Sequence, residues 1–125
     1  MPLRSSTSSV LKWPDRRAVD RAVREIAAVF SVQRPELVRF GYFGSYARGD
    51  WGVGSDVDLV AIVRASEWPF IERARHFDTS RLPVPADILI YTEAEWEALL
   101  EQGSRFADQV RRETVWVFPA NEGSD

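Results

Sequence analysis

The chain has 125 residues, a formal net charge of −3, no cysteine, one histidine at His76 and one lysine at Lys12. The length favours a single globular domain. The absence of cysteine excludes disulfides and metal sites built from thiolates, and a single histidine excludes a His-rich metal site. One lysine near the start of the chain argues against a Walker loop or a protein-kinase site, because both need a lysine that binds the phosphates. The negative charge gives no general attraction to nucleic acid, and without a long apolar run or a signal-peptide pattern we expect no membrane partner and a cytoplasmic protein.

The first predicted element is a helix that follows a tail. Residues 1–13 include several serines and show no clear period, so we expect them to be flexible. Pro14 and Asp15 then give a helix start signal and Pro35 a stop signal. Between them, apolar residues recur at spacings of three and four and form one helical face: Val19, Ala22, Val23, Ile26, Ala27 and Phe30. The arginines that lie between these positions are predicted to form a solvated face.

A glycine-rich loop separates two predicted strands. Leu37 to Phe43 is the first strand, and Asp56 to Val63 is the second, with apolar residues on both faces as in a strand that is covered on both sides. Five of the seven glycines lie between Gly41 and Gly54. Tyr46 to Gly49 favours a short helical turn within this loop.

The second half of the chain alternates helices and strands. A helix is predicted from Glu67 to about Ser80, with four residues facing the core: Phe70, Ile71, Ala74 and Phe77. Ala86 to Tyr91 is a third strand. Thr92 and Glu95 form a capping box that begins a helix ending at Gly103, whose acidic residues are predicted to form an exposed face: Glu93, Glu95, Glu97 and Glu101. Ser104 begins a further helix, and Thr114 to Phe118 is a short last strand.

This order of elements predicts the fold class. Strands that alternate with helices in this way indicate an α+β domain with a mixed four-stranded sheet and helices packed against it. The domain is predicted to span residues 14–118, and residues 119–125 form a polar tail.

Paired carboxylates mark the candidate site. Asp56 and Asp58 are two residues apart at the beginning of a strand, so both side chains lie on one face, roughly 7 Å apart along the backbone, and can converge on one cation. Two such carboxylates repel each other unless a cation lies between them, one is protonated or both are well solvated. Oxygen ligands suit Mg²⁺, which substrate phosphates commonly complete. A glycine loop beside them lets the backbone approach phosphates, and Ser45 adds a hydroxyl. By composition alone, however, the same segment is equally typical of a surface connection between strands.

The ordered pattern adds a resemblance to a known family. Gly44-Ser45-Tyr46-Ala47-Arg48-Gly49, six further residues and then Asp56-Val57-Asp58 resemble the G-S-x-A-R-G…S-D-x-D signature of the DNA polymerase β-like nucleotidyltransferases. The match is closest to their minimal, stand-alone type, which occurs in HEPN/MNT toxin–antitoxin pairs. It covers roughly residues 38–118 and implies the nucleotidyltransferase fold.

The resemblance also implies roles for individual residues. It assigns two Mg²⁺ ions to Asp56, Asp58 and a third carboxylate, for which Asp87 fits in order and context, although an exposed strand-end aspartate would look the same. Gly44 and Ser45 would hold the β and γ phosphates of ATP, and Ser55 also belongs to the signature. Arg48 would either contact phosphate or tie the loop to an acid such as Asp50. Trp51 is not part of the signature, and its place in the loop leaves two roles open: an exposed loop aromatic or a lid over a base.

The implied activity is transfer of a nucleoside monophosphate, AMP from ATP, to a hydroxyl group. The expected acceptor lies on a partner protein of the HEPN type, with this chain as its antitoxin. One alternative is a small-molecule acceptor, with a second copy of the chain in a homo-oligomer forming the other wall of the acceptor pocket. A non-catalytic module that masks a partner is the other.

Overall fold

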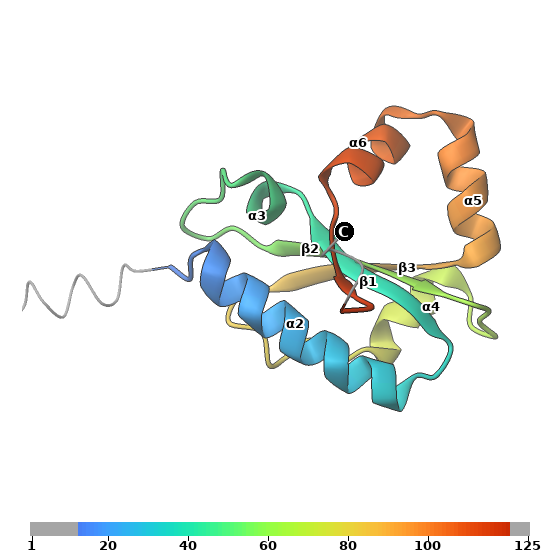
Figure 1. The fold of residues 1–125 in the computed structure, drawn as a ribbon, viewed down its shortest axis with the longest axis horizontal. Coiled ribbons are helices and arrows are strands. Elements are labelled where there is room, and N and C mark those ends of the chain that lie inside the picture. The colour runs from blue at the N-terminus through green and yellow to red at the C-terminus, as the bar shows by residue number, and fades with distance from the viewer. Residues whose placement is uncertain (1–12, 121–125) are drawn as a thin grey trace, which may run out of the picture.

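The structure is a computed structural model that describes residues 13–120, so the tails predicted at both ends fall almost wholly outside the described residues. The helices are α2 (Arg16–Gln33), α3 (Ser45–Arg48), α4 (Phe70–Arg73), the 3-10 helix η1 (Ala74–His76), α5 (Glu93–Gln102) and α6 (Arg105–Glu113). The strands are β1 (Leu37–Phe43), β2 (Val57–Val63), β3 (Ala86–Thr92) and β4 (Val115–Phe118). Figure 1 shows their arrangement.

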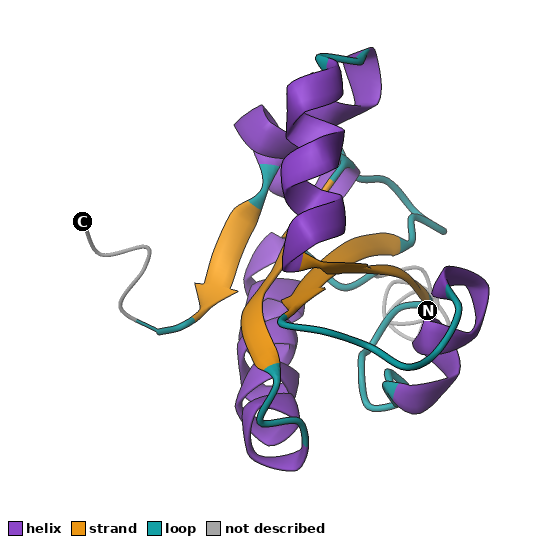
Figure 2. Cartoon of the chain, turned by 90° about the vertical axis from the view of Figure 1, so that its right-hand side faces the viewer, coloured by secondary structure: helices purple, strands orange, loops and turns teal. Residues whose placement is uncertain are grey.

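The four strands form one mixed sheet, which confirms the predicted α+β class. Their order across the sheet is β3-β2-β1-β4. β1 is antiparallel to β2 and to β4, whereas β2 and β3 are parallel. Figures 1 and 2 show α2 on one face of the sheet and the α5–α6 pair on the other. Because both faces are covered, β2 is buried along almost its whole length, as its apolar sequence predicted.

The face under α2 holds the larger core. Asp15 caps α2 by accepting a hydrogen bond from the Ala18 N–H at 3.0 Å. The predicted apolar face is buried at five positions: Val19, Val23, Ile26, Ala27 and Phe30. The Phe30 ring meets the rings of Phe40 and Phe77 edge to face, at 5.5 and 5.0 Å between centroids.

The other face carries a smaller core under α5 and α6. Its buried residues are Phe43, Val60, Ile62, Trp96 and Val110. The capping box predicted at Thr92 and Glu95 is confirmed in both directions. Gly103 ends α5 in the left-handed region, and Ser104 caps α6. These two helices therefore sit where the sequence predicted them.

The helix predicted from Glu67 to Ser80 is wrong in length and in orientation. Only the short α4 and η1 form, and Ile71 is 84% exposed while Arg73 is 6% exposed. Arg73 takes the inward position because its guanidinium is satisfied there: it donates to the carbonyl oxygens of Trp68 and Ile90 and to the Glu95 carboxylate. Of the four residues expected to face the core, Phe77 does so, whereas Ala74, Phe70 and Ile71 are exposed.

Between residues 13 and 120, no helix combines the length and the apolar character needed to cross a bilayer.

Candidate functional site

Neighbouring strand ends bring the predicted carboxylates together. β2 and β3 are paired in parallel with Asp58 opposite Asp87, and Asp56 comes directly before β2. Asp58 alternates with Val57 and Leu59, so its side chain lies on the α5–α6 face, as does that of Asp87. Asp58 is half-buried, while Asp56 and Asp87 are exposed. All three predicted acids thus lie at one end of the two strands.

The ionised form of Asp58 is destabilised in this arrangement. Burial raises the pKa of its carboxyl, and the negative charges of Asp87 and Asp56 raise it further, whereas Arg48 lowers it. Within the described part of the chain, no hydrogen bond or ion pair reaches the side chains of these three aspartates. A half-buried carboxylate without a bonded partner, beside two others, favours a cation.

The donor set fits a magnesium ion that is shared with a substrate. Among residues 13–120, no three acidic or histidine side chains are gathered tightly enough to enclose an ion by themselves. Mg²⁺ is usually held by one or two carboxylates together with water and substrate phosphates, rather than by a complete protein cage. Asp58 with one neighbouring aspartate therefore provides the kind of partial site that this ion uses.

The glycine loop passes directly against Asp58. Gly44 has φ +78°, and a Cβ atom built there would collide with Asp58 Oδ2 and lie 3.1 Å from its Cγ. Only glycine accommodates both this conformation and this close approach. Ser45 follows as the first residue of α3, which confirms the predicted helical turn. The loop backbone and the paired carboxylates therefore share one site.

Aromatic residues fix the rest of the loop. Tyr46 is fully buried, and its hydroxyl donates to the Pro14 carbonyl oxygen at 2.8 Å. Trp51 is half-buried and stacks on Tyr46 with an interplanar angle of 11°, so in this structure it supports the loop. Ser55 accepts a hydrogen bond from the Gly52 N–H at 2.8 Å through its hydroxyl and thereby closes a turn just before Asp56.

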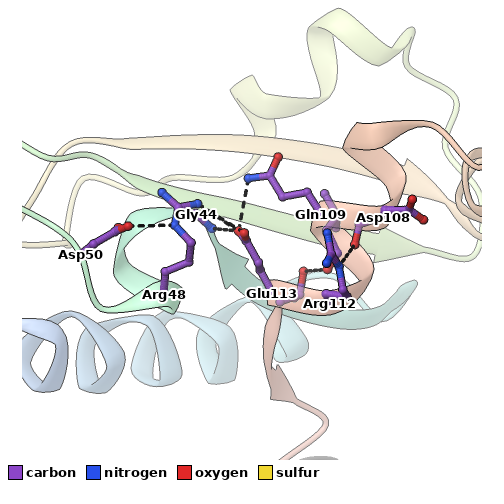
Figure 3. A network of polar contacts seen from close by, with 9 residues as sticks. Gly44, Arg48, Asp50, Asp108, Gln109, Arg112 and Glu113 are labelled. Carbon is purple, nitrogen blue, oxygen red and sulfur yellow. Dashed lines mark hydrogen bonds and ion pairs between the residues drawn. The ribbon is translucent and has the colours of Figure 1, made fainter.

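Arg48 and Glu113 form a polar network over the loop (Figure 3). Arg48 Nε donates to Asp50 at 3.1 Å, which realises the predicted tie to that acid, and Arg48 Nη1 donates to Glu113 at 3.2 Å. Glu113 Oε1 also accepts from the Gly44 N–H at 3.3 Å and from Gln109 at 3.2 Å. Sequence reasoning missed Glu113. Its only local signal is the spacing of four from Gln109, which does not point to a loop 69 residues away.

A cavity of about 600 Å³ opens beside the aspartates. Apart from Asp58, Asp87 and Thr79, its lining is apolar: Phe43, Ala74, Phe77, Ala86, Ile88, Leu89 and Phe106. A groove of about 670 Å³ lies elsewhere, along α2. There Asp20 is already bonded to Arg24 and to the Tyr42 hydroxyl, so we place the candidate site at the first cavity.

Comparisons with known proteins identify the family and agree with the fold. The model of the family described as the nucleotidyltransferase domain matches residues 23–117. A crystal structure of a Sulfolobus solfataricus protein, provisionally described as a nucleotidyltransferase, superposes with a TM-score of 0.61 at 18% identity and covers 86% of each chain; at this identity the likeness shows the fold alone. No curated protein gives a significant match. Because the family model spans the sheet, the glycine loop and all three aspartates, the chain belongs to the nucleotidyltransferase domain family.

Proposed function

We propose that the protein transfers AMP from ATP to a hydroxyl group and releases pyrophosphate. The proposal rests on the register that sets Asp58 opposite Asp87, with Gly44 packed against Asp58. In this reaction the hydroxyl oxygen forms a bond to the α phosphorus, the bond from that phosphorus to the bridging oxygen of pyrophosphate breaks, and the hydroxyl proton leaves to a base. No protein nucleophile is needed, which suits a chain without cysteine.

The three aspartates are the residues that would hold the metal. Asp56 and Asp58, joined by Asp87, are proposed to bind two Mg²⁺ ions, which would offset the negative charge on the attacking and leaving oxygens. The raised pKa of Asp58 supports this assignment, because burial of the carboxylate and its repulsion by Asp87 and Asp56 raise it, and a bound cation would offset both effects. Asp87 is more exposed than Asp58 and is proposed to accept the hydroxyl proton.

The loop is proposed to hold the phosphates. The Gly44 N–H and the Ser45 hydroxyl would donate to the β and γ phosphates, and Arg48 would supply a positive charge from the same loop. The close contact between Gly44 and Asp58 supports this role, because it sets the loop's donors beside the carboxylates. Ser55 contributes by closing the turn that leads into Asp56.

The acceptor is proposed to be a hydroxyl on a partner protein of the HEPN type, for which this chain would be the antitoxin. The cavity beside Asp58 and Asp87 supports an acceptor much larger than water. Phe43 and Phe106 meet edge to face in its wall, with 6.1 Å between ring centroids. Such a lining suits an aromatic side chain such as tyrosine.

Transfer of label from α-labelled ATP tests this function. Wild type incubated with Mg²⁺ and an extract of host cells should label one protein band, and the Asp56→Ala, Asp58→Ala double variant or a metal chelator should abolish it. Glu97→Gln is the matched control, because Glu97 is exposed on α5 and should leave labelling unchanged. If the label enters only small molecules, the acceptor is a metabolite and not a protein. If the protein binds ATP but no transfer depends on the aspartates, the protein is instead a non-catalytic module that masks its partner.

A further inference from the structure

Glu113 lies at the end of α6 with its carboxylate turned onto the glycine loop (Figure 3). Its side chain is 21% exposed. Gln109, one turn earlier on α6, donates to Glu113 Oε1 at 3.2 Å and orients the carboxylate. α6 ends at this residue, and β4 begins two residues later. Two elements from the far end of the chain thus place one anion over the loop.

The groups that bind this anion are the ones proposed to bind phosphate. Glu113 Oε1 accepts from the Gly44 N–H at 3.3 Å and from Arg48 Nη1 at 3.2 Å, and Oε2 lies 3.4 Å from the same nitrogen. A carboxylate and a phosphate are both anionic acceptors with oxygens that suit an N–H donor and a guanidinium. The single Gly44 N–H therefore cannot serve both anions at once, and the phosphate would also compete with Glu113 for Arg48 Nη1.

The geometry of the contact favours displacement over permanent bracing. Its three distances lie at or beyond the long end of the usual range for N–H···O bonds. The Glu113 side chain is partly exposed and can leave by rotation about its own bonds, without a change in the backbone of α6. Arg48 would keep its bond to Asp50 after Glu113 leaves, so the loop retains a tie when the contact opens.

The charge of Glu113 also acts on the catalytic side of the loop. Its carboxylate is among the groups that raise the pKa of Asp58, so its field reaches the site proposed for the metal. A triphosphate entering this site would meet a fourth negative side chain beside the three aspartates, in addition to the competition for donors.

We propose that Glu113 is an internal competitor of the nucleotide: its carboxylate occupies the Gly44 N–H and Arg48 in the resting protein, and the triphosphate must displace it in order to bind. The inference rests on the proposed function, since it assigns these donors to the phosphates. Glu113 would then lower the affinity for the nucleotide and so raise the concentration at which the site is half-saturated.

Binding of α,β-methylene ATP, an analogue that cannot transfer AMP, tests the inference by calorimetry with Mg²⁺. Glu113→Gln keeps the size of the side chain and removes its charge, and Glu113→Ala removes the contact. Both should bind the analogue about 10-fold more tightly than wild type, a size typical of losing one competing charge-assisted hydrogen bond. Asp108→Asn is the matched control: Asp108 is exposed on the same helix and its loss changes the net charge equally, so affinity should stay at the wild-type value.

The outcomes separate this inference from the proposed function. Analogue binding that is unchanged or weaker in both Glu113 variants would make Glu113 a structural brace of the loop and overturn the inference alone. Failure of every protein, wild type included, to bind the analogue would overturn the proposed function together with it. A thermal melt of each variant checks folding, and Glu113→Gln decides the question if Glu113→Ala does not fold.

Discussion

At the scale of single residues, Gly44 joins backbone conformation to chemistry. Gly44→Ala places a methyl group in the left-handed region and against Asp58 Oδ2, which we expect to cost about 1–3 kcal/mol of stability. It should also lower transfer by about 10- to 100-fold, the loss typical of disturbing a group that orients a metal ligand, which is the role proposed for Asp58. Gly52→Ala is the control, because among residues 13–120 no heavy atom beyond Gly52 and its two chain neighbours lies within 4 Å of the added methyl group. Thermal unfolding and transfer are measured on both; equal behaviour of the two variants would contradict this role of Gly44.

Asp58 should show that the site costs stability. Its folded-state pKa is raised by burial and by Asp87 and Asp56, so the ionised carboxylate subtracts stability above that pKa, and the penalty vanishes below the unfolded value. Asp58→Asn should therefore melt at a higher temperature than wild type at neutral pH without metal. The difference should disappear as the solution is made acidic, and transfer should be lost at every pH. A melting temperature at or below wild type at neutral pH would refute this account.

At the scale of elements, one ion pair ties the α4 segment to α5. Glu95 accepts from buried Arg73 with both oxygens and also caps α5, so it departs from the exposed acidic face predicted for this helix. We expect Glu95→Ala to cost about 2 kcal/mol, less than for a fully buried pair because Glu95 is 42% exposed. Denaturant unfolding measures the loss. Glu97→Ala, an exposed neighbour, should change stability by no more than ~0.5 kcal/mol.

The same pair gives a pH dependence of known sign. The hydrogen bond from Arg73 lowers the pKa of Glu95, so its stabilisation is present above the ordinary glutamate value and is lost as the pH falls through the lowered one. Glu95→Gln should therefore show a flatter fall in stability toward acid than wild type. Parallel curves for the two proteins would show that this pair does not contribute.

The elements that the sequence predicted correctly are those whose local signals agree. α2 has an apolar stripe, a capping aspartate and a proline stop, and β2 has continuous apolar character. The prediction of a long helix after Glu67 was wrong because four apolar residues at helical spacing do not determine which face of the segment packs against the core. The ion pair between Arg73 and Glu95 orients this segment instead. A local sequence pattern does not predict such a tertiary contact.

At the scale of the whole molecule, the site divides in the same way. The proximity of Asp56 and Asp58 followed from their spacing at the start of β2, whereas Asp87 was predicted from the family resemblance. The parallel register of β2 and β3 then sets Asp87 opposite Asp58. Glu113 reaches Gly44 only because α6 packs over the same face and β4 returns beside β1. Such contacts depend on the assembled fold, so a site built from distant segments is only partly visible in a sequence.

The return of β4 to β1 gives a prediction that involves the whole fold. A Cβ atom at Gly41 would lie 2.5 Å from the Val115 carbonyl oxygen and 3.0 Å from Trp116 Cα, so Gly41→Ala must push β4 outward and should cost about 1–3 kcal/mol. Because β4 follows Glu113 by two residues, that shift should also loosen the Glu113 contact with Gly44. We therefore expect a variant that melts earlier, yet binds α,β-methylene ATP at least as tightly as wild type at temperatures where it is folded. Weaker binding by the folded variant would mean that β4 holds the loop in its binding conformation, and that the Glu113 contact helps the nucleotide.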